Sequence, residues 1–110
     1  MNEVIELTQE LLSIPYIEEN SPVFDGSFCF TPYMADGLMG NGNVLSMSTR
    51  AYIDLFYRDK EVCVSSALSL WKSINATQGM TAEAPDYTYE ENAKLWRASL
   101  PIETIHKEEI

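Results

Sequence analysis

The clearest pattern in the sequence is an alternation of two kinds of residue between positions 44 and 58. One set of alternating positions is core-like and consists of Leu45, Met47, Thr49, Ala51, Ile53 and Leu55. The other set is polar but carries two aromatic residues, and it consists of Ser46, Ser48, Arg50, Tyr52, Asp54 and Phe56. A period of two residues predicts a β-strand with one buried face. At about 3.3 Å per residue the segment exceeds a normal strand, so we expect it to bend, bulge or extend beyond the domain body.

Two other segments have the spacing of amphipathic helices. The first is residues 3–13, and Pro15 ends it because the residue before a proline avoids the helical region. The second is residues 60–76, which Asp59 can cap and which Gly79 follows in a turn. The apolar stripes are Val4, Leu7, Leu11 and Leu12 in the first segment, and Val64, Ala67, Leu68, Trp71 and Ile74 in the second.

The remaining strands are shorter or interrupted. Residues 27–32 alternate, residues 80–90 form a modest strand broken by Pro85, and residues 93–104 form a final strand. Pro101 lacks an N–H group, so its part of the final strand is expected at an edge or bulge. Together the segments predict an α+β fold, a mainly antiparallel sheet of about four strands with two helices packed on one face. We expect a single domain over residues 1–105 and a frayed tail over residues 106–110.

Residues 33–43 contain three glycines and are predicted to form a long loop. Three large apolar residues lie in this segment, Met34, Leu38 and Met39. Apolar residues in such a loop either fold back on the core or contact a partner. We therefore expect the loop to be mobile in an isolated subunit and to become ordered on assembly.

The charge of the chain excludes one class of partner. The formal net charge is −10 and the isoelectric point is about 4.3. Binding to a nucleic-acid backbone needs clustered Lys and Arg, which this sequence lacks. The acidity is compatible with simple solubility, with a basic partner or with mimicry of DNA. Without a long apolar run or a signal-peptide pattern, no membrane association is expected, and synthesis is expected in the cytosol.

We find no pattern that predicts catalysis. The glycines at 37, 40 and 42 fit neither a phosphate-binding loop nor a dinucleotide fingerprint. His106 is the only histidine and lies in the predicted tail, so neither a hydrolytic triad nor a zinc site is expected. Cys29 and Cys63 are interpreted as buried free thiols, with a disulfide between them as the minor alternative. The adjacent carboxylate pairs are interpreted as solvated surface. The sequence thus predicts no catalytic residue, no cofactor and no metal, and a protein that is not an enzyme.

Two segments carry a family resemblance. Residues 51–60 read AYIDLFYRDK, and residues 89–100 read YEENAKLWRASL. With the order of helices and strands, they resemble the tail-terminator (tail-completion, minor tail) proteins of long-tailed phages and prophages. The resemblance implies a virion structural protein that forms a hexameric ring and caps the tail tube. Its partners would be further copies of itself, the tail-tube protein and the head–tail connector. Its location would be the host cytoplasm at synthesis and then the virion tail.

The interface predicted for such a ring is the more polar face of the long strand, Arg50, Tyr52, Asp54 and Phe56, together with Met34, Leu38 and Met39 of the loop. Two other classes of function stay open. An acidic inhibitor or DNA mimic would carry carboxylates along one face at phosphate-like spacing. A small enzyme or ligand-binding domain would carry a deep pocket with convergent polar groups.

Overall fold

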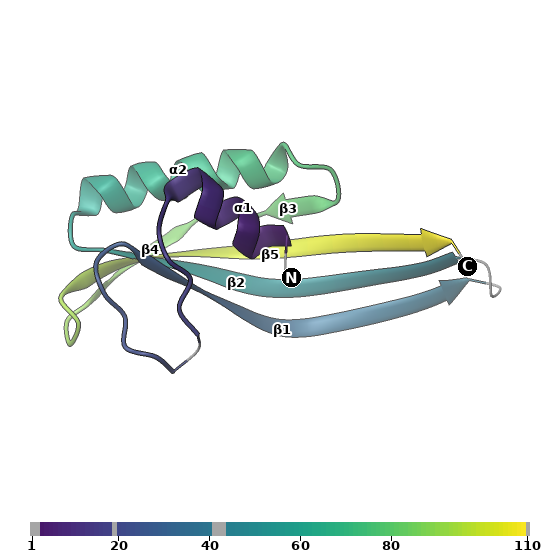
Figure 1. Ribbon diagram of the computed structural model, residues 1–110, viewed down its shortest axis with the longest axis horizontal. Coiled ribbons are helices and arrows are strands. Elements are labelled where there is room, and N and C mark those ends of the chain that lie inside the picture. Colours follow the sequence, from purple (N-terminus) through teal and green to yellow (C-terminus); the bar gives the residue numbers. More distant parts are fainter. Residues whose placement is uncertain (1–2, 19, 41–43, 110) are drawn as a thin grey trace.

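The computed structural model describes the backbone of residues 3–18, 20–40 and 44–109, and the side chains of these residues outside 34–40, 44–47 and 106–109. The described elements are two helices and one five-stranded antiparallel sheet (Figure 1), which confirms the predicted α+β class with one more strand than expected. In chain order they are α1 (Glu3–Leu12), β1 (Ser27–Gly40), β2 (Val44–Tyr57), α2 (Lys60–Asn75), β3 (Met80–Ala82), β4 (Asp86–Glu90) and β5 (Leu95–Glu109).

Three long strands form the body of the sheet. β2 is central and pairs antiparallel with β1 on one side and with β5 on the other. In β1 the register shifts between Pro32 and Met34, where a β-bulge inserts an extra residue. The sequence had predicted a bend, bulge or extension for residues 44–58, whereas this bulge lies in the neighbouring strand β1.

The far edge of β5 is covered by two short strands with a break between them. β3 pairs with residues 102–104 and β4 with residues 95–99. The break contains Pro85, as predicted, and lies opposite Pro101. Pro101 accepts a hydrogen bond from the N–H of Glu83 at 2.9 Å, so the side of Pro101 that lacks an N–H faces the break. Pro101 is therefore in an interior strand, β5, where an edge or bulge had been predicted. The interruption lies in the layer beside it, between β3 and β4, and β5 itself is continuous.

Both helices lie on one face of the sheet (Figure 1) and enclose the core. Asp59 caps α2 by accepting hydrogen bonds from the backbone N–H groups of Glu61 and Val62. The core combines alternate positions of the strands with most of the apolar stripes of the helices, whereas Leu11 and Leu68 of those stripes are exposed. Its fully buried members include Val4, Phe28, Ala51, Ile53, Leu55, Cys63, Ala67, Leu70, Ile74, Ala98 and Leu100.

The three long strands continue past the helices as a projecting end (Figure 1). We call residues 34–40, 44–48 and 105–109 the sheet arm; their backbones pair in register, with Ser48 opposite Asp36 and Ile105. The prediction of a loop is wrong for residues 33–40, which belong to β1, and residues 41–43 lie outside the described residues. The predicted frayed tail also differs, because β5 continues to Glu109 by pairing with β2. Both segments are weak strand formers whose conformation comes from pairing with a distant part of the chain.

Candidate functional site

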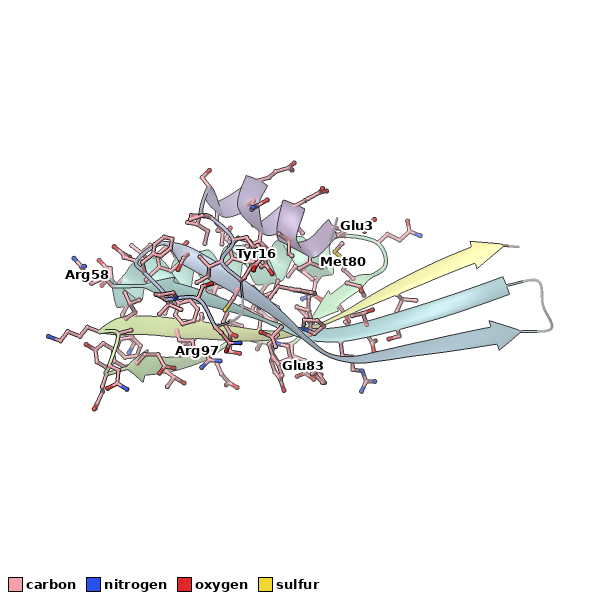
Figure 2. All side chains as sticks on the ribbon, turned by 60° about the horizontal axis from the view of Figure 1, so that its bottom comes forward. Glu3, Tyr16, Arg58, Met80, Glu83 and Arg97 are labelled. Carbon is pink, nitrogen blue, oxygen red and sulfur yellow. The ribbon has the colours of Figure 1, made fainter. Side chains whose placement is uncertain are left out.

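Neither helix covers the opposite face of the sheet (Figure 1). Figure 2 shows the side chains of Glu83 and Arg97 on this side, away from α1. The cross-strand register brings Arg50 beside Glu103, Tyr52 beside Pro101 and Asp54 beside Ser99. We call this surface the helix-free face.

Two of the four predicted interface residues on this face are buried, so the prediction needs correction. Tyr52 is 41% exposed and Arg50 is exposed, as expected. Asp54 is only 4% exposed and Phe56 only 5%. The reason is Arg97, which is the cross-strand partner of Phe56 and reaches over the carboxylate of Asp54. The long aliphatic part of an arginine covers apolar surface beside it while its charged end binds elsewhere.

Arg97 joins three strands at this end of the face. Its Nε donates to Asp54 Oδ1 at 3.2 Å, and its Nη1 donates to Glu90 Oε1 at 3.2 Å. Burial by itself lowers the pKa of Arg97, but the hydrogen bond and charge of Asp54, followed by those of Glu90, outweigh it and raise the pKa. The guanidinium is thus a permanent cation that compensates the buried carboxylate.

A second, more exposed ion pair lies towards the sheet arm. Arg50 Nε donates to Glu103 Oε2 at 2.9 Å, and the Ser48 hydroxyl donates to the same oxygen at 3.1 Å. The hydrogen bonds from Arg50 and then Ser48 lower the pKa of Glu103 below its ordinary value. Glu103 therefore stays a carboxylate at neutral pH.

A hollow of about 270 Å³ opens beside this second ion pair, at the break between β3 and β4. Its lining residues are Tyr33, Arg50, Thr81, Glu83, Pro101, Ile102 and Glu103. Tyr33 comes from the bulge of β1 and stacks on Tyr52, with ring centroids 4.8 Å apart and an interplanar angle of 28°. The hollow is partly open to solvent and is not the fully enclosed cavity typical of a small-molecule site.

The other predicted interface residues lie on the sheet arm. The backbones of Met34, Leu38 and Met39 pair with Arg50, Ser46 and Leu45 respectively. Their side chains are outside the described part of the structure. The arm thus places all three on a strand next to β2, where the sequence had predicted a separate loop.

Burial dominates the surroundings of the Cys63 thiol and the Tyr87 hydroxyl. Cys63 is a buried free thiol, and Cys29 is partly buried. Burial raises the pKa of the Cys63 thiol to about 11, which keeps it protonated and a poor nucleophile. The hydroxyl of Tyr87 is buried without a hydrogen-bond partner among the described residues. Within those residues, no group of three or more His, Cys, Asp or Glu side chains could hold a metal ion.

Neither helix of the described chain has the length and apolar character needed to cross a membrane. Compared with known proteins, the sequence matches no family model and no curated protein.

The sequence did not point to Tyr33, Glu83 or Glu103 as surface-site residues. Tyr33 comes from β1, Glu83 from the break that follows β3, and Glu103 from β5. Only the strand register brings these three residues together. One usable signal was present in the sequence: Pro85 and Pro101 both disfavour regular pairing. A break in a sheet exposes side chains of the next strand, which is where the hollow forms.

Proposed function

We propose that this chain is a non-enzymatic structural protein that works as a subunit of a ring-forming assembly, of the kind that terminates phage tails. The single observation that carries the proposal is the sheet arm, which extends three paired strands beyond both helices (Figure 1). This feature supplies the two elements that an assembling subunit needs.

The first element is a pair of open strand edges. On the outer edge of β1, the described backbone contacts involve Phe28, and none is described from Phe30 to Gly40. At about 3.3 Å per residue this edge is roughly 35 Å long. On the outer edge of β5, the last described contact is the hydrogen bond from Ile105 N–H to the Gly79 carbonyl at 2.8 Å. Long open edges pair readily with strands of other chains.

The second element is a single layer of sheet in which apolar residues are frequent. Large apolar residues of the sheet arm before Ser48 include Met34, Leu38, Met39, Leu45 and Met47. The alternation in the sequence had placed Leu45 and Met47 on the core-like face of the long strand. A sheet needs a covering layer or a partner to be stable in water. Burial of this layer in an interface satisfies that need.

The geometry of the edges favours a ring. The open edges belong to β1 and β5, which are different surfaces on opposite sides of the sheet. A contact between unlike surfaces is heterologous, and repeating it with a closing rotation gives a cyclic oligomer. The resemblance to tail terminators suggests a hexamer, with the tail-tube protein and the head–tail connector as its neighbours.

The alternative function, an acidic inhibitor or DNA mimic, receives less support. Among the described residues, Asp54, Glu90 and Glu103 are each bound to an arginine. These three of the chain's seventeen acidic residues are therefore not available to imitate free phosphates.

The test is the mass of the purified protein in solution, measured by light scattering at moderate salt over a range of concentrations, with and without purified tail-tube protein from the same source. We expect a discrete species of several 12.5 kDa subunits, formed alone or on tubes. A matched variant replaces residues 37–47 by Asn-Gly, which joins the paired residues Asp36 and Ser48 through a two-residue turn.

This shortened variant should keep the circular dichroism of a folded α+β domain and remain monomeric. Assembly by the shortened variant would show that the sheet arm is not the interface. A wild-type chain that stays monomeric and binds no tubes would refute the ring and make the acidic inhibitor the leading alternative.

A further inference from the structure

We propose that the hollow on the helix-free face binds an arginine side chain presented by a different protein. This inference does not depend on the ring, because the hollow lies on the body of the sheet and not on the sheet arm. It assigns a ligand chemistry to a surface made by the break between β3 and β4.

The charges in the hollow favour a cation. Its lining includes two carboxylates, Glu83 and Glu103, and one guanidinium, Arg50. Arg50 and Ser48 both bind Glu103, whereas Glu83 makes no ion pair among the described residues. One negative charge at the hollow is therefore left uncompensated. The net charge of −10 adds a long-range attraction for basic partners.

The aromatic wall favours a planar cation. Tyr33 and Tyr52 are stacked, yet each keeps nearly half of its surface in solvent, 49% and 41% respectively. Tyrosine faces attract cations, and a guanidinium also stacks flat on them. A lysine ammonium lacks this planar stacking and binds a carboxylate at a single point. The combination of Tyr33 with Glu83 thus fits arginine better than lysine.

The hollow already contains one pair of an arginine with a carboxylate. Arg50 lines the hollow and donates from its guanidinium to Glu103 at 2.9 Å. Glu83 is the second carboxylate of the same hollow, without a guanidinium of its own. An incoming arginine would complete a second pair, with Pro101 providing apolar surface for its aliphatic part.

The size of the hollow limits the ligand to a side chain. Sites for small-molecule ligands are usually enclosed and about 300–1,000 Å³ in volume. An open hollow of about 270 Å³ is smaller and accepts the end of one long residue from a protein surface. Exposed tyrosines around a point contact are also typical of protein interfaces.

The experiment is an NMR titration of the full chain, with backbone amides assigned, using the capped pentapeptide Gly-Ser-Arg-Ser-Gly. The control peptide carries citrulline, the neutral isostere of arginine. We expect weak binding, in the millimolar range, with shifts centred on Tyr33, Thr81 and Glu83. The citrulline peptide should produce no comparable shifts.

The matched variants are Glu83→Gln and Glu10→Gln. Both remove one carboxylate from an exposed residue, but Glu10 lies on α1, on the opposite side of the sheet. Glu83→Gln should weaken binding about two- to fivefold, the range expected for an exposed ion pair. Glu10→Gln should change the affinity only slightly, because it removes the same net charge at a distance.

Three results would overturn the proposal. The first is no localised shift at the highest peptide concentration, and the second is equal shifts from the arginine and citrulline peptides. The third is a Glu83→Gln protein that binds the peptide normally but loses self-association, which would make a second copy of the chain the occupant of the hollow.

Discussion

Arg97 on β5 hydrogen-bonds through its Nε to Asp54 on β2, at a distance of 3.2 Å, and this contact buries the Asp54 carboxylate in the helix-free face. Asp54 had been predicted as an exposed interface residue because it alternates with Tyr52 in the sequence. The contact divides the face into an end closed by Arg97 and an end that remains open around Tyr33 and Tyr52.

The Arg97 contact predicts unequal effects for two arginine substitutions. Arg97→Leu leaves a buried carboxylate without its cation and should lower the free energy of unfolding by about 1–3 kcal/mol. Arg50→Leu removes the exposed pair with Glu103 and should cost less than about 1 kcal/mol. Urea unfolding followed by circular dichroism measures both. Equal losses would show that Asp54 does not depend on Arg97.

The core placement of β2 predicts a large loss from a single truncation. Leu55 is fully buried between the helices and the sheet, so Leu55→Ala should cost about 2–5 kcal/mol. Leu68 on α2 is 38% exposed, and Leu68→Ala should cost under about 1 kcal/mol because little buried surface is lost. Thermal melting compares the two variants with the wild type. An unchanged melting temperature for Leu55→Ala would contradict its placement.

Two buried tyrosines should respond in opposite ways to loss of the hydroxyl. The Tyr87 hydroxyl is buried without a described partner, so Tyr87→Phe should leave stability unchanged or raise it by about 1 kcal/mol. Burial raises the pKa of Tyr57 while its interaction with the Ser66 side chain lowers it, and Tyr57→Phe removes that interaction and should lower stability by about 0.5–1.5 kcal/mol. Chemical denaturation of both variants is the measurement. Destabilisation by Tyr87→Phe would reveal a partner for that hydroxyl.

The buried thiol predicts a loss of stability at alkaline pH. The pKa of Cys63 rises from an ordinary value of 9.0 to about 11 in the folded chain, because burial disfavours the thiolate. A pKa raised by folding gives stability that is fully present below pH 9.0 and is lost as the pH rises towards about 11.

Denaturant midpoints measured from below pH 9.0 upwards should therefore fall more steeply for the wild type than for Cys63→Ala. The alanine variant is less stable at every pH because it leaves a cavity, so the comparison uses the slope alone. Burial also raises the pKa of Tyr57 and Tyr87 in both proteins, whereas the smaller rise caused by the charge of Cys63 is present only in the wild type and adds to the difference in slope. Parallel slopes would show that Cys63 is not buried as a thiol.

The sequence by itself determined the kind and order of most elements. The spacing of Val4 and Leu7, the alternation around Ile53 and the capping of α2 by Asp59 all depend on residues close together in the chain. Local periodicity and capping report such features directly. The interruption of a strand by Pro85 is likewise a property of one residue, and the structure divides this segment into β3 and β4 just before and after it.

Only the tertiary structure decided which strand positions are covered and which are open. Residues 34–40 and 106–109 have weak strand propensity, and they become strands because β2 lies between them as a pairing partner. Asp54 is buried because Arg97, 43 positions later in the chain, reaches across it. Glu83 and Tyr33 line the same hollow because the tertiary structure places the bulge of β1 and the break beside β5 around it. Each of these relationships depends on register between distant segments, and a change of one residue in register would move every side chain to the opposite face.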